Sequence, residues 1–395
     1  MAEFMDTLIE LYDPRPINNV LGSEVFRPRE TVFICSPEVE QDKALRRALK
    51  TYFEYRGVDV KLTFRPVSLV DALRVEKVIR EVIEAHPDCA IDISGGTDAA
   101  LFAAGAASRE VPVFTYSRKR NTFFEIRNAP YARNLPCPVR MDARSCFLMA
   151  GGTLLPGRGD NRTLPGRLEE IDRLFEVYTR FSRIWNRQIS YIQAISSAEA
   201  GALEARGKET EKAGDRWVTA NATLLRALEE AGLIWDLRMA EGSVAFHFPD
   251  ETIRFWLRDI GAVLELQVFR ACLAAECFDD VVISAVVNWE GGTSQRDSVT
   301  NEIDVVAVRG IQPVFISCKT SEIRTEALNE LAILRDRFGG ETSRAIIVTS
   351  APATKNRAAM RRRAAELRIE VVEGGELDLE SLTQRLRLSV GRKPY

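Results

Sequence analysis

Short apolar segments alternate with amphipathic ones over the first part of this chain, and this alternation limits the folds that it can adopt. Segments with the length and composition of strands lie at 31–35, 58–62, 89–93 and 111–116. Helical patterns lie between them, through Leu45, Leu49 and Phe53, at Val70–Ala85 and at Ala99–Ser108. Strands that alternate with helices form a largely parallel, doubly wound sheet. We therefore predict an α/β domain for residues 1–150.

The rest of the chain divides into two further units, because 395 residues exceed one ordinary core. Residues 151–250 predict a helical, winged-helix-like connector, with helices at 168–197 and 218–232 and a small strand at 245–248. Glycine-rich stretches at 151–152, 156–159 and 201–214 are expected to be its flexible joints. Residues 251–395 predict a second α/β domain. Its expected elements are helices at 254–277, 322–338 and 352–367, and strands at 281–288, 301–306, 315–319, 344–349 and 369–372.

Composition excludes several classes of protein. The formal net charge of −3 provides no overall attraction for a polyanion, so any nucleic-acid contact must be local. The seven cysteines form no CxxC pair and are odd in number, which favours free thiols in a reducing compartment. With two histidines, a histidine-based zinc site or triad is improbable. The sequence shows neither a signal peptide nor an apolar stretch of membrane-spanning length, so we expect a cytoplasmic protein without a membrane partner.

A carboxylate and a lysine mark a candidate catalytic site near the C-terminus. Asp304 lies in Asn301-Glu302-Ile303-Asp304-Val305-Val306, and Lys319 ends Phe315-Ile316-Ser317-Cys318-Lys319. Arg309–Pro313 between them has turn chemistry, which predicts a two-stranded hairpin. A carboxylate that holds a hard cation beside a lysine suits metal-dependent cleavage of a phosphodiester.

Glu265 is the third candidate of this site. It lies among apolar residues of the helix at 254–277, and an acid on a partly apolar face indicates a paired or metal-binding group. Each residue has an ordinary alternative: Glu265 as a solvated or salt-bridged acid, Asp304 as a strand cap and Lys319 as an edge-strand charge. The combination is more specific than its members.

A glycine loop marks a second candidate site. Ser94, Gly95, Gly96 and Thr97 lie between a strand end and a helix start, where ligands bind in open parallel sheets. Backbone N–H groups and a helix N-terminus favour an anion there. Ser36 follows the first predicted strand on the same edge, and Arg118 follows another. A tight turn with an N-cap is the alternative interpretation. The absence of GxxxxGK[ST] excludes an ATPase P-loop.

With these motifs the chain resembles the CARF–nuclease effectors of type III CRISPR defence. The resemblance is carried by Thr7–Glu10, Ser94–Thr97, Leu264-Glu265, Asn301–Val305 and Phe315–Lys319. It implies an N-terminal Rossmann-like CARF domain (1–150), the connector (151–250) and a C-terminal restriction-endonuclease-like PD-(D/E)XK domain (251–395).

The resemblance also implies a function. Family members are homodimers whose CARF domains bind a cyclic oligoadenylate, usually the tetra-adenylate, and thereby activate Mn²⁺- or Mg²⁺-dependent cleavage of DNA or RNA. A twofold ligand across a twofold interface agrees with homodimer symmetry. Carried over, the activator would contact Ser36, Ser94, Gly95, Gly96, Thr97 and Arg118. The catalytic residues would be Glu265, Asp304, Ser317 and Lys319, with Glu265 and Asp304 as the metal ligands.

Two departures from the family pattern leave alternatives open. The pattern has an acid two residues before the lysine, where this chain has Ser317, and Asp98 follows the glycine loop where a cation would suit a phosphate better. The first alternative is a non-catalytic sensor on a degenerate nuclease fold. The second is a transcriptional regulator that uses the connector as a winged helix, although residues 218–232 contain few Lys or Arg.

Overall fold

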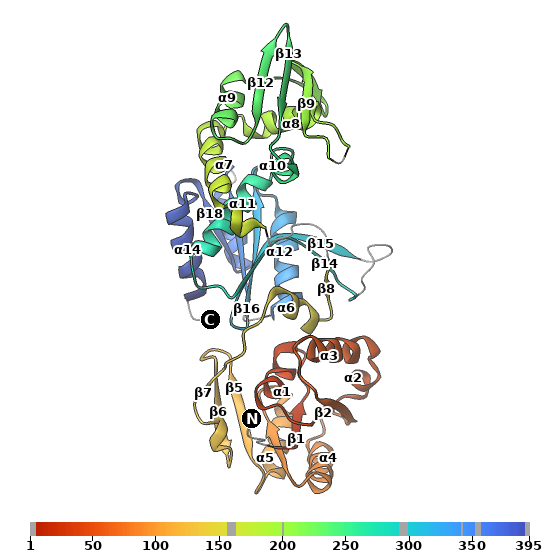
Figure 1. The fold of residues 1–395 in the computed structure, drawn as a ribbon. Helices are drawn as coiled ribbons and strands as arrows, with labels where there is room; N and C mark the ends of the chain where they lie inside the picture. Colours follow the sequence, from red (N-terminus) through yellow and green to blue (C-terminus); the bar gives the residue numbers. More distant parts are fainter. Residues whose placement is uncertain are drawn as a thin grey trace.

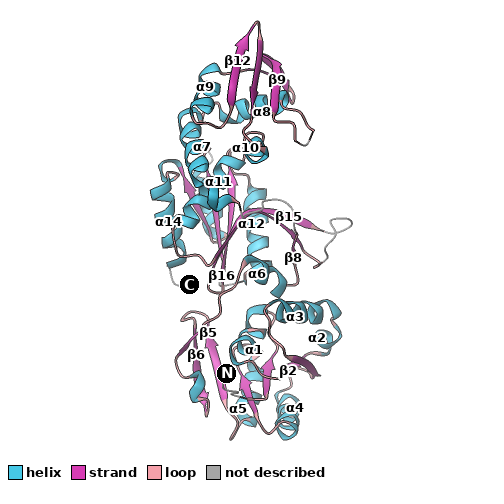
Figure 2. Ribbon diagram, viewed as in Figure 1, coloured by secondary structure: helices cyan, strands magenta, loops and turns pink. Residues whose placement is uncertain are grey.

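The structure, a computed structural model, describes residues 5–155, 163–199, 201–291, 299–340, 343–351 and 357–391. Three parts follow one another along a long axis, with the N-terminal domain at one end, the C-terminal domain in the centre and a middle module at the other end (Figure 1). Helices and strands mix in every part (Figure 2). Among the described residues, no helix has the length and apolar character needed to span a membrane.

The N-terminal domain is the predicted doubly wound sheet. Its strands run in the order β3-β2-β1-β4-β5-β6-β7, parallel through β5 and antiparallel beyond. The strands are β1 (Thr7–Leu11), β2 (Glu30–Cys35), β3 (Lys61–Pro66), β4 (Cys89–Asp92), β5 (Val113–Ser117), β6 (Thr122–Arg127) and β7 (Leu135–Pro136). The helices are α1 (Leu21–Phe26), α2 (Pro37–Gln41), α3 (Lys43–Tyr55), α4 (Ala72–Ala85) and α5 (Asp98–Ala107), with 3₁₀ turns at Pro16–Asn19 and Pro130–Ala132.

Strand β3 begins later than the prediction at residue 58. Gly57 has a φ of 63°, and the Val58 N–H donates to the Phe53 carbonyl at 2.9 Å. This is a helix C-terminus closed by a left-handed glycine. Val58 is buried against the end of α3, so the apolar pattern marked a helix cap instead of a strand.

The middle module has a three-stranded antiparallel sheet in the order β12-β13-β9, a separate β10–β11 hairpin and three helices, as expected of a winged-helix-like connector. Its elements are α7 (Leu168–Phe181), α8 (Trp185–Ile195), β9 (Glu204–Lys208), β10 (Thr210–Ala213), β11 (Arg216–Thr219), α9 (Ala222–Glu230), β12 (Trp235–Ala240) and β13 (Ser243–His247).

Three expectations for this module were wrong. Residues 201–214 contain β9 and β10 rather than a flexible joint, and the helix predicted at 168–197 is broken between α7 and α8. The helix predicted from Val218 starts after Asn221, whose side chain caps it by accepting from the Leu224 N–H at 2.9 Å. The predicted joint at 156–159 lies outside the described residues.

The C-terminal domain is a sheet in the order β18-β17-β16-β15-β14-β8, and it contains the predicted hairpin. Its strands are β8 (Thr153–Leu154), β14 (Asp280–Asn288), β15 (Thr300–Arg309), β16 (Gln312–Lys319), β17 (Arg344–Thr349) and β18 (Ile369–Glu373). The helices are α6 (Ala143–Met149), α10 (Glu251–Trp256), α11 (Ala262–Ala274), α12 (Thr325–Phe338), α13 (Arg357–Glu366) and α14 (Leu379–Gly391), with 3₁₀ turns at Leu164–Arg167 and Gly374–Glu376.

Several boundaries in this domain differ from the sequence predictions. The helix predicted at 254–277 is two helices, α10 and α11, and α14 was not predicted. Residues 352–356 of the helix predicted at 352–367 lie outside the described part of the chain. Strand β8 pairs with β14 in the C-terminal sheet, so the boundary predicted at residue 150 falls within a segment that packs against this domain.

Each face of the C-terminal sheet shares a hydrophobic core with a different part of the molecule. One face packs on α11, α14 and the middle module in a single buried cluster. The other face packs on α12 and α6, and its cluster continues into the N-terminal domain. Helix α6 therefore joins the first domain to the C-terminal sheet.

Phe147 on α6 makes this junction. Its fully buried ring lies 5.1 Å from that of Phe338 in an edge-to-face arrangement and 6.2 Å from that of Phe315 on β16. On the opposite side, α6 meets α3: the Tyr55 hydroxyl donates to Asp142 at 2.5 Å, and the Arg144 guanidinium lies 4.6 Å above the Tyr55 ring. Polar contacts thus fix α6 to the N-terminal domain, and aromatic contacts fix it to β16.

Phe147→Ala should destabilise the protein by roughly 3–5 kcal/mol, because it removes a buried ring and leaves a cavity. Calorimetric unfolding of the full chain measures the change. Phe102→Ala is the matched control, since Phe102 is 73% exposed and its removal should shift the transition little. Equal effects of the two substitutions would contradict the account of α6.

Candidate active site and sensor loop

Asp304 is held by three donors on the neighbouring strand. Its Oδ2 atom accepts from the Cys318 backbone N–H at 2.5 Å, the Ser317 hydroxyl at 3.1 Å and the Lys319 ammonium at 3.2 Å. Regular pairing of β15 with β16 ends at Val305 and Ile316, so the Asp304 side chain takes the amide that a ladder partner would otherwise bond. The hairpin therefore brings Asp304, Ser317 and Lys319 together at one point.

Glu265 reaches the same site from α11. Burial, followed by the negative charges of Asp304 and Asp259, raises the pKa of Glu265 to about 8. Its Oε2 atom accepts from the Ser284 hydroxyl on β14 at 3.2 Å. The four predicted catalytic residues thus lie around one site, where the charge of Asp304 acts on Glu265 and Lys319 lies beside Asp304.

Ser284 was missed by the sequence analysis. It has a φ of 49° within a strand, a conformation that costs free energy for a residue with a side chain. Ser284 on β14 and Asp304 on β15 are not paired with each other, although Ile283 pairs with Val305 before them and Ala285 pairs with Ile303 after them. This local distortion, which leaves the register unchanged on both sides, places the Ser284 hydroxyl in contact with Glu265. A lone serine in the apolar run 281–287 was the available signal.

The donor set at this site fits a hard divalent cation. Glu265 and Asp304 repel each other in a partly buried setting, and a cation between them would relieve this repulsion. Within the described ranges, no three His, Cys, Asp and Glu side chains gather closely enough to hold a metal ion. Two carboxylates with water and substrate oxygens in the remaining positions is a common arrangement for Mg²⁺.

A small cavity of about 50 Å³ lies beside the site, on the side of α12. Asp304, Ser317 and Lys319 line it together with Glu302 and Glu330. Glu330 accepts from the Asn301 amide at 2.6 Å. Glu302 and Glu330 are thus the acids that line this cavity beside Asp304.

The glycine loop of the N-terminal domain is held by two acidic residues. Asp92 accepts from the Ser94 N–H at 2.7 Å and from the Ser94 hydroxyl, which itself accepts from the Tyr116 N–H at 2.8 Å. Asp13 accepts from the Gly96 N–H at 3.1 Å. A Cβ atom at Gly95 would lie 2.6 Å from the Cβ of Asp13, so only glycine fits. The sequence predicted that this loop binds the anion of a ligand. At Gly96 the Asp13 carboxylate of the protein itself occupies that position.

Asp13 is itself fixed in place. Burial alone would raise its pKa, but hydrogen bonds from Arg15 and from the Gly96 backbone outweigh burial and lower the pKa. The Asn19 side chain bonds both the N–H and the carbonyl of Asp13, at 2.9 and 2.7 Å. The loop conformation is therefore set before any ligand arrives.

The remaining predicted contact residues lie at the same edge of the sheet. The Thr97 hydroxyl donates to the Leu69 carbonyl at 2.8 Å and caps α5. Ser36 occupies the N-cap position of α2. Arg118 follows β5 and lines a cleft of about 190 Å³ between the domains, together with Arg15 and Arg337. Ser94, Gly96 and Thr97 thus bond within the domain, and the arginines provide positive charge beside them.

Two carboxyls are buried beneath this loop. Glu10 on β1 and Asp92 on β4 are register partners, each 1% exposed. A methyl group added at Gly22 of α1 would lie 2.6 Å from Asp92 Oδ2 and 2.8 Å from Glu10 Oε1, so both face this glycine. Burial and the neighbouring Asp92 raise the pKa of Glu10 well above its ordinary value, and burial raises that of Asp92 to about 7.

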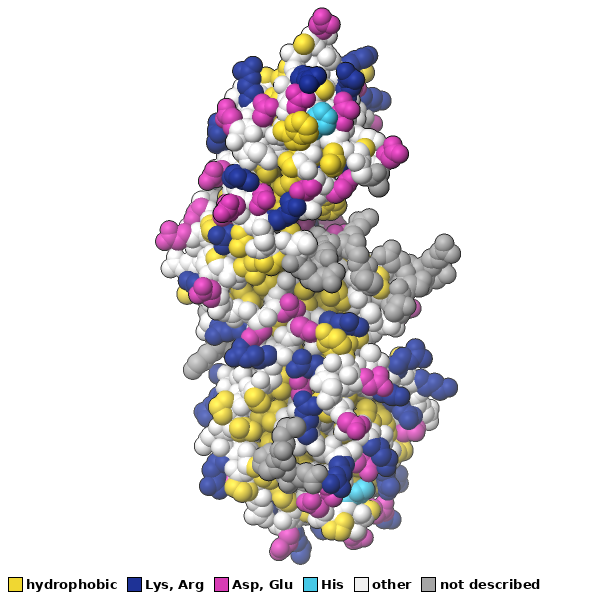
Figure 3. Space-filling view, in the orientation of Figure 1, with side chains coloured by type: hydrophobic (Ala, Val, Ile, Leu, Met, Phe, Trp, Pro, Cys, Tyr) yellow, Lys and Arg dark blue, Asp and Glu magenta, His cyan; other side chains and the backbone are white. Residues whose placement is uncertain are grey.

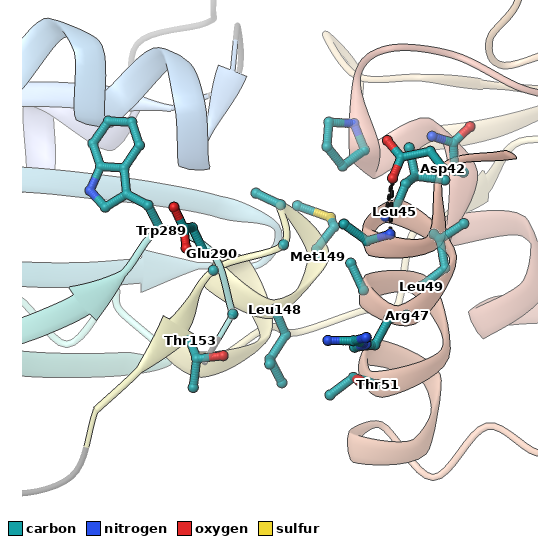
Figure 4. A pocket seen from close by; sticks show the side chains of 18 of the residues that line it. Asp42, Leu45, Arg47, Leu49, Thr51, Leu148, Met149, Thr153, Trp289 and Glu290 are labelled. Atoms are coloured by element: carbon teal, nitrogen blue, oxygen red, sulfur yellow. Dashed lines mark hydrogen bonds between the residues drawn. The ribbon is translucent and has the colours of Figure 1, made fainter. Parts of the chain in front are cut away.

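A larger pocket, of about 390 Å³, lies where α3 faces the end of α6 (Figure 4). Leu45, Arg47, Leu49 and Thr51 line it from α3, and Leu148 and Met149 line it from α6. Trp289 and Glu290, at the end of β14, complete the wall from the C-terminal domain. Because three elements from two domains form this pocket, its shape depends on how the domains pack.

Fold and site together define an α/β protein with a doubly wound N-terminal sheet, a middle module and a C-terminal α/β domain that carries a carboxylate–lysine site. More specifically, residues 250–388 match the family model of the Card1-like endonuclease domain. The C-terminal domain is therefore similar to the Card1-like endonuclease domain. A comparison with curated proteins finds no match to the sequence.

Solved structures share the fold over the whole chain. Protein VC1899 from Vibrio cholerae superposes with a TM-score of 0.74 and 18% identity, covering 98% of this chain and 99% of that one. Can2 from Sulfobacillus thermosulfidooxidans, solved in complex with cyclic tetra-adenylate, gives 0.68 and 16%, with 98% of both chains covered. A type III CRISPR defence DNA nuclease activated by cyclic oligoadenylate gives 0.56 and 16%, and this chain spans 53% of its length.

Glu10→Gln should weaken the pH dependence of stability. An acid whose pKa is raised by folding binds its proton more tightly in the folded state, so stability falls as pH rises above the ordinary value of 4.5. Between its unfolded and folded pKa values, each such group lowers the free energy of unfolding by about 1.4 kcal/mol per pH unit. Melting temperatures across this pH range should fall less steeply in the variant. The exposed Glu84→Gln should keep the wild-type slope; a Glu10→Gln slope equal to it would contradict this assignment.

Proposed function

We propose that this protein is a nuclease of type III CRISPR defence that cleaves nucleic acid with a divalent cation, Mn²⁺ or Mg²⁺, and is activated by a cyclic oligoadenylate. The observation that carries the proposal is the convergence of Glu265, Asp304 and Lys319 from α11, β15 and β16 in a domain similar to the Card1-like endonuclease domain. The activator is proposed to be cyclic tetra-adenylate, since Can2 shares the fold and binds it.

The residues of the site divide the chemistry between them. Glu265 and Asp304 would hold the cation, which activates water and offsets charge on the phosphate when bound. Lys319 lies 3.2 Å from Asp304, where its ammonium would stabilise the anion that develops on the scissile phosphate. The Ser317 hydroxyl and the Cys318 amide hold the Asp304 carboxylate in its orientation.

Regulation is proposed to run through α6. An activator bound at the edge of the CARF sheet would alter the packing of α3 on α6, and Phe147 would transmit this to β16, which carries Ser317 and Lys319. We propose a homodimer, so that two CARF domains share one cyclic ligand. Tighter binding of the activator to the active arrangement would shift the population toward it.

Asp304→Asn should abolish cleavage, and Lys319→Ala should lower it by roughly 100- to 1,000-fold, because it removes one preorganised stabilising charge. Cleavage of DNA and RNA, single- and double-stranded, is measured with Mn²⁺ and cyclic tetra-adenylate. Wild-type protein should also melt at a higher temperature with Mn²⁺, and the Asp304→Asn variant should not. Cleavage unaffected by either substitution would refute the proposed site. A wild-type protein that binds the activator without cleaving anything would favour the non-catalytic sensor, for which Ser317 in the acid position is the main support.

Gly95→Ala should abolish the response to cyclic tetra-adenylate, because the added methyl group collides with Asp13 and displaces the loop. Calorimetric titration measures binding, and the cleavage assay measures activation. Gly105→Ala in α5 is the matched control, since a Cβ atom there meets nothing within 4 Å. Retained binding in Gly95→Ala would place the activator elsewhere.

A further inference from the structure

One stretch of the middle module combines positive charge with an absence of acids. Residues 177–198 contain Arg180, Arg183 and Arg187 and no Asp or Glu, in a chain whose formal net charge is −3. Figure 3 shows Lys and Arg interspersed with Asp and Glu over the visible face of the molecule, so a local run without acids stands apart from the rest.

The three arginines are available to a partner. All three side chains are exposed, at the end of α7, in the turn that follows it and at the start of α8. None of the three forms an ion pair with a carboxylate in the part of the chain that the structure describes. The Arg180 guanidinium lies 5.5 Å from the neighbouring Phe181 ring. An aromatic ring carries no negative charge, so this contact does not neutralise Arg180.

This stretch is fixed beside the candidate catalytic lysine at two points. The Asn186 amide donates to the Thr320 carbonyl at 3.3 Å, one residue beyond Lys319. Tyr178 is buried in the hydrophobic cluster that also contains Cys318, the residue directly before Lys319. Arg180 and Arg183 lie between these contacts, and Arg187 follows directly. Helix α7 runs along the junction of the middle module and the C-terminal domain in Figure 1.

We infer that Arg180, Arg183 and Arg187 form a phosphate-binding surface that holds the nucleic-acid strand entering the cleavage site. This inference rests on the proposed nuclease function. Guanidinium groups bind phosphate oxygens in pairs and are always charged, which suits contacts to a sugar–phosphate backbone without sequence preference. The middle module then contributes to substrate binding through α7, α8 and the turn between them, and not through the β10–β11 hairpin or α9.

The test is a binding assay that does not depend on cleavage. Full-length Asp304→Asn protein, with cyclic tetra-adenylate, is titrated onto labelled single-stranded DNA, duplex DNA and single-stranded RNA over a series of salt concentrations. Adding R180Q, R183Q and R187Q should weaken binding at low salt. The slope of log affinity against log salt should become shallower by about one for each phosphate group that the variant no longer binds.

Two control variants separate a phosphate contact from a structural effect. R206Q, R216Q and R226Q remove the same charge from exposed residues of β9, β11 and α9 in the same module, and should leave binding and its salt slope nearly unchanged. R180K, R183K and R187K keep the charge and should retain most of the affinity. The melting temperatures of all three variants should equal that of the parent.

The outcomes distinguish this inference from the proposed function. If the wild-type protein cleaves nucleic acid and R180Q, R183Q and R187Q change neither binding nor cleavage, the inference is wrong and the nuclease assignment stands. Failure of the R206Q, R216Q and R226Q variant to bind would instead place the surface on β9, β11 and α9 and overturn the inference. If the wild-type protein cleaves nothing but the salt slope changes as expected, the surface exists and the proposed function fails.

Discussion

Strand β16 is the constraint on which the rest of the structure depends. Its Phe315 packs toward Phe147 of α6, and two and four residues later it presents Ser317 and Lys319 to Asp304. Because protein interiors are closely packed, β16 cannot shift at one end without disturbing the other. One strand therefore carries both the contact that reaches the N-terminal domain and the groups proposed for cleavage.

At both candidate sites, buried or half-buried carboxylates accept hydrogen bonds from other groups of the protein. At the nuclease site, one oxygen of Asp304 accepts from three donors, and Glu265 bonds Ser284. At the glycine loop, Asp13 and Asp92 hold Gly96 and Ser94 in position. The loop was expected to offer its backbone N–H groups to a phosphate, but Asp13 already accepts from that of Gly96. An activator at this edge would therefore rely on contacts to ribose or adenine and on the cations Arg15, Arg118 and Arg337.

The sequence predicted elements whose pattern is local and left out those that depend on tertiary contacts. Strand–helix alternation indicated the doubly wound class of the N-terminal sheet but left out β1, β6 and β7. The hairpin was found because Arg309–Pro313 separates two apolar runs. The contact of Ser284 with Glu265 and that of Asp13 with Gly96 could not be predicted, since each joins residues distant in sequence. Helix α6 was not predicted, because Phe147 packs on Phe315 and Phe338, which are distant in sequence. The strands β9 and β10 were missed because their glycines and charged residues resemble a linker.

The central claim is that the nuclease site is inactive until the CARF domain binds its ligand. The most direct measurement is the rate at which the full chain cleaves nucleic acid with Mn²⁺, compared in the presence and absence of cyclic tetra-adenylate. We predict cleavage that requires the activator and that disappears on chelation of the metal. Equal rates with and without the activator, in a protein that binds it, would contradict the claim.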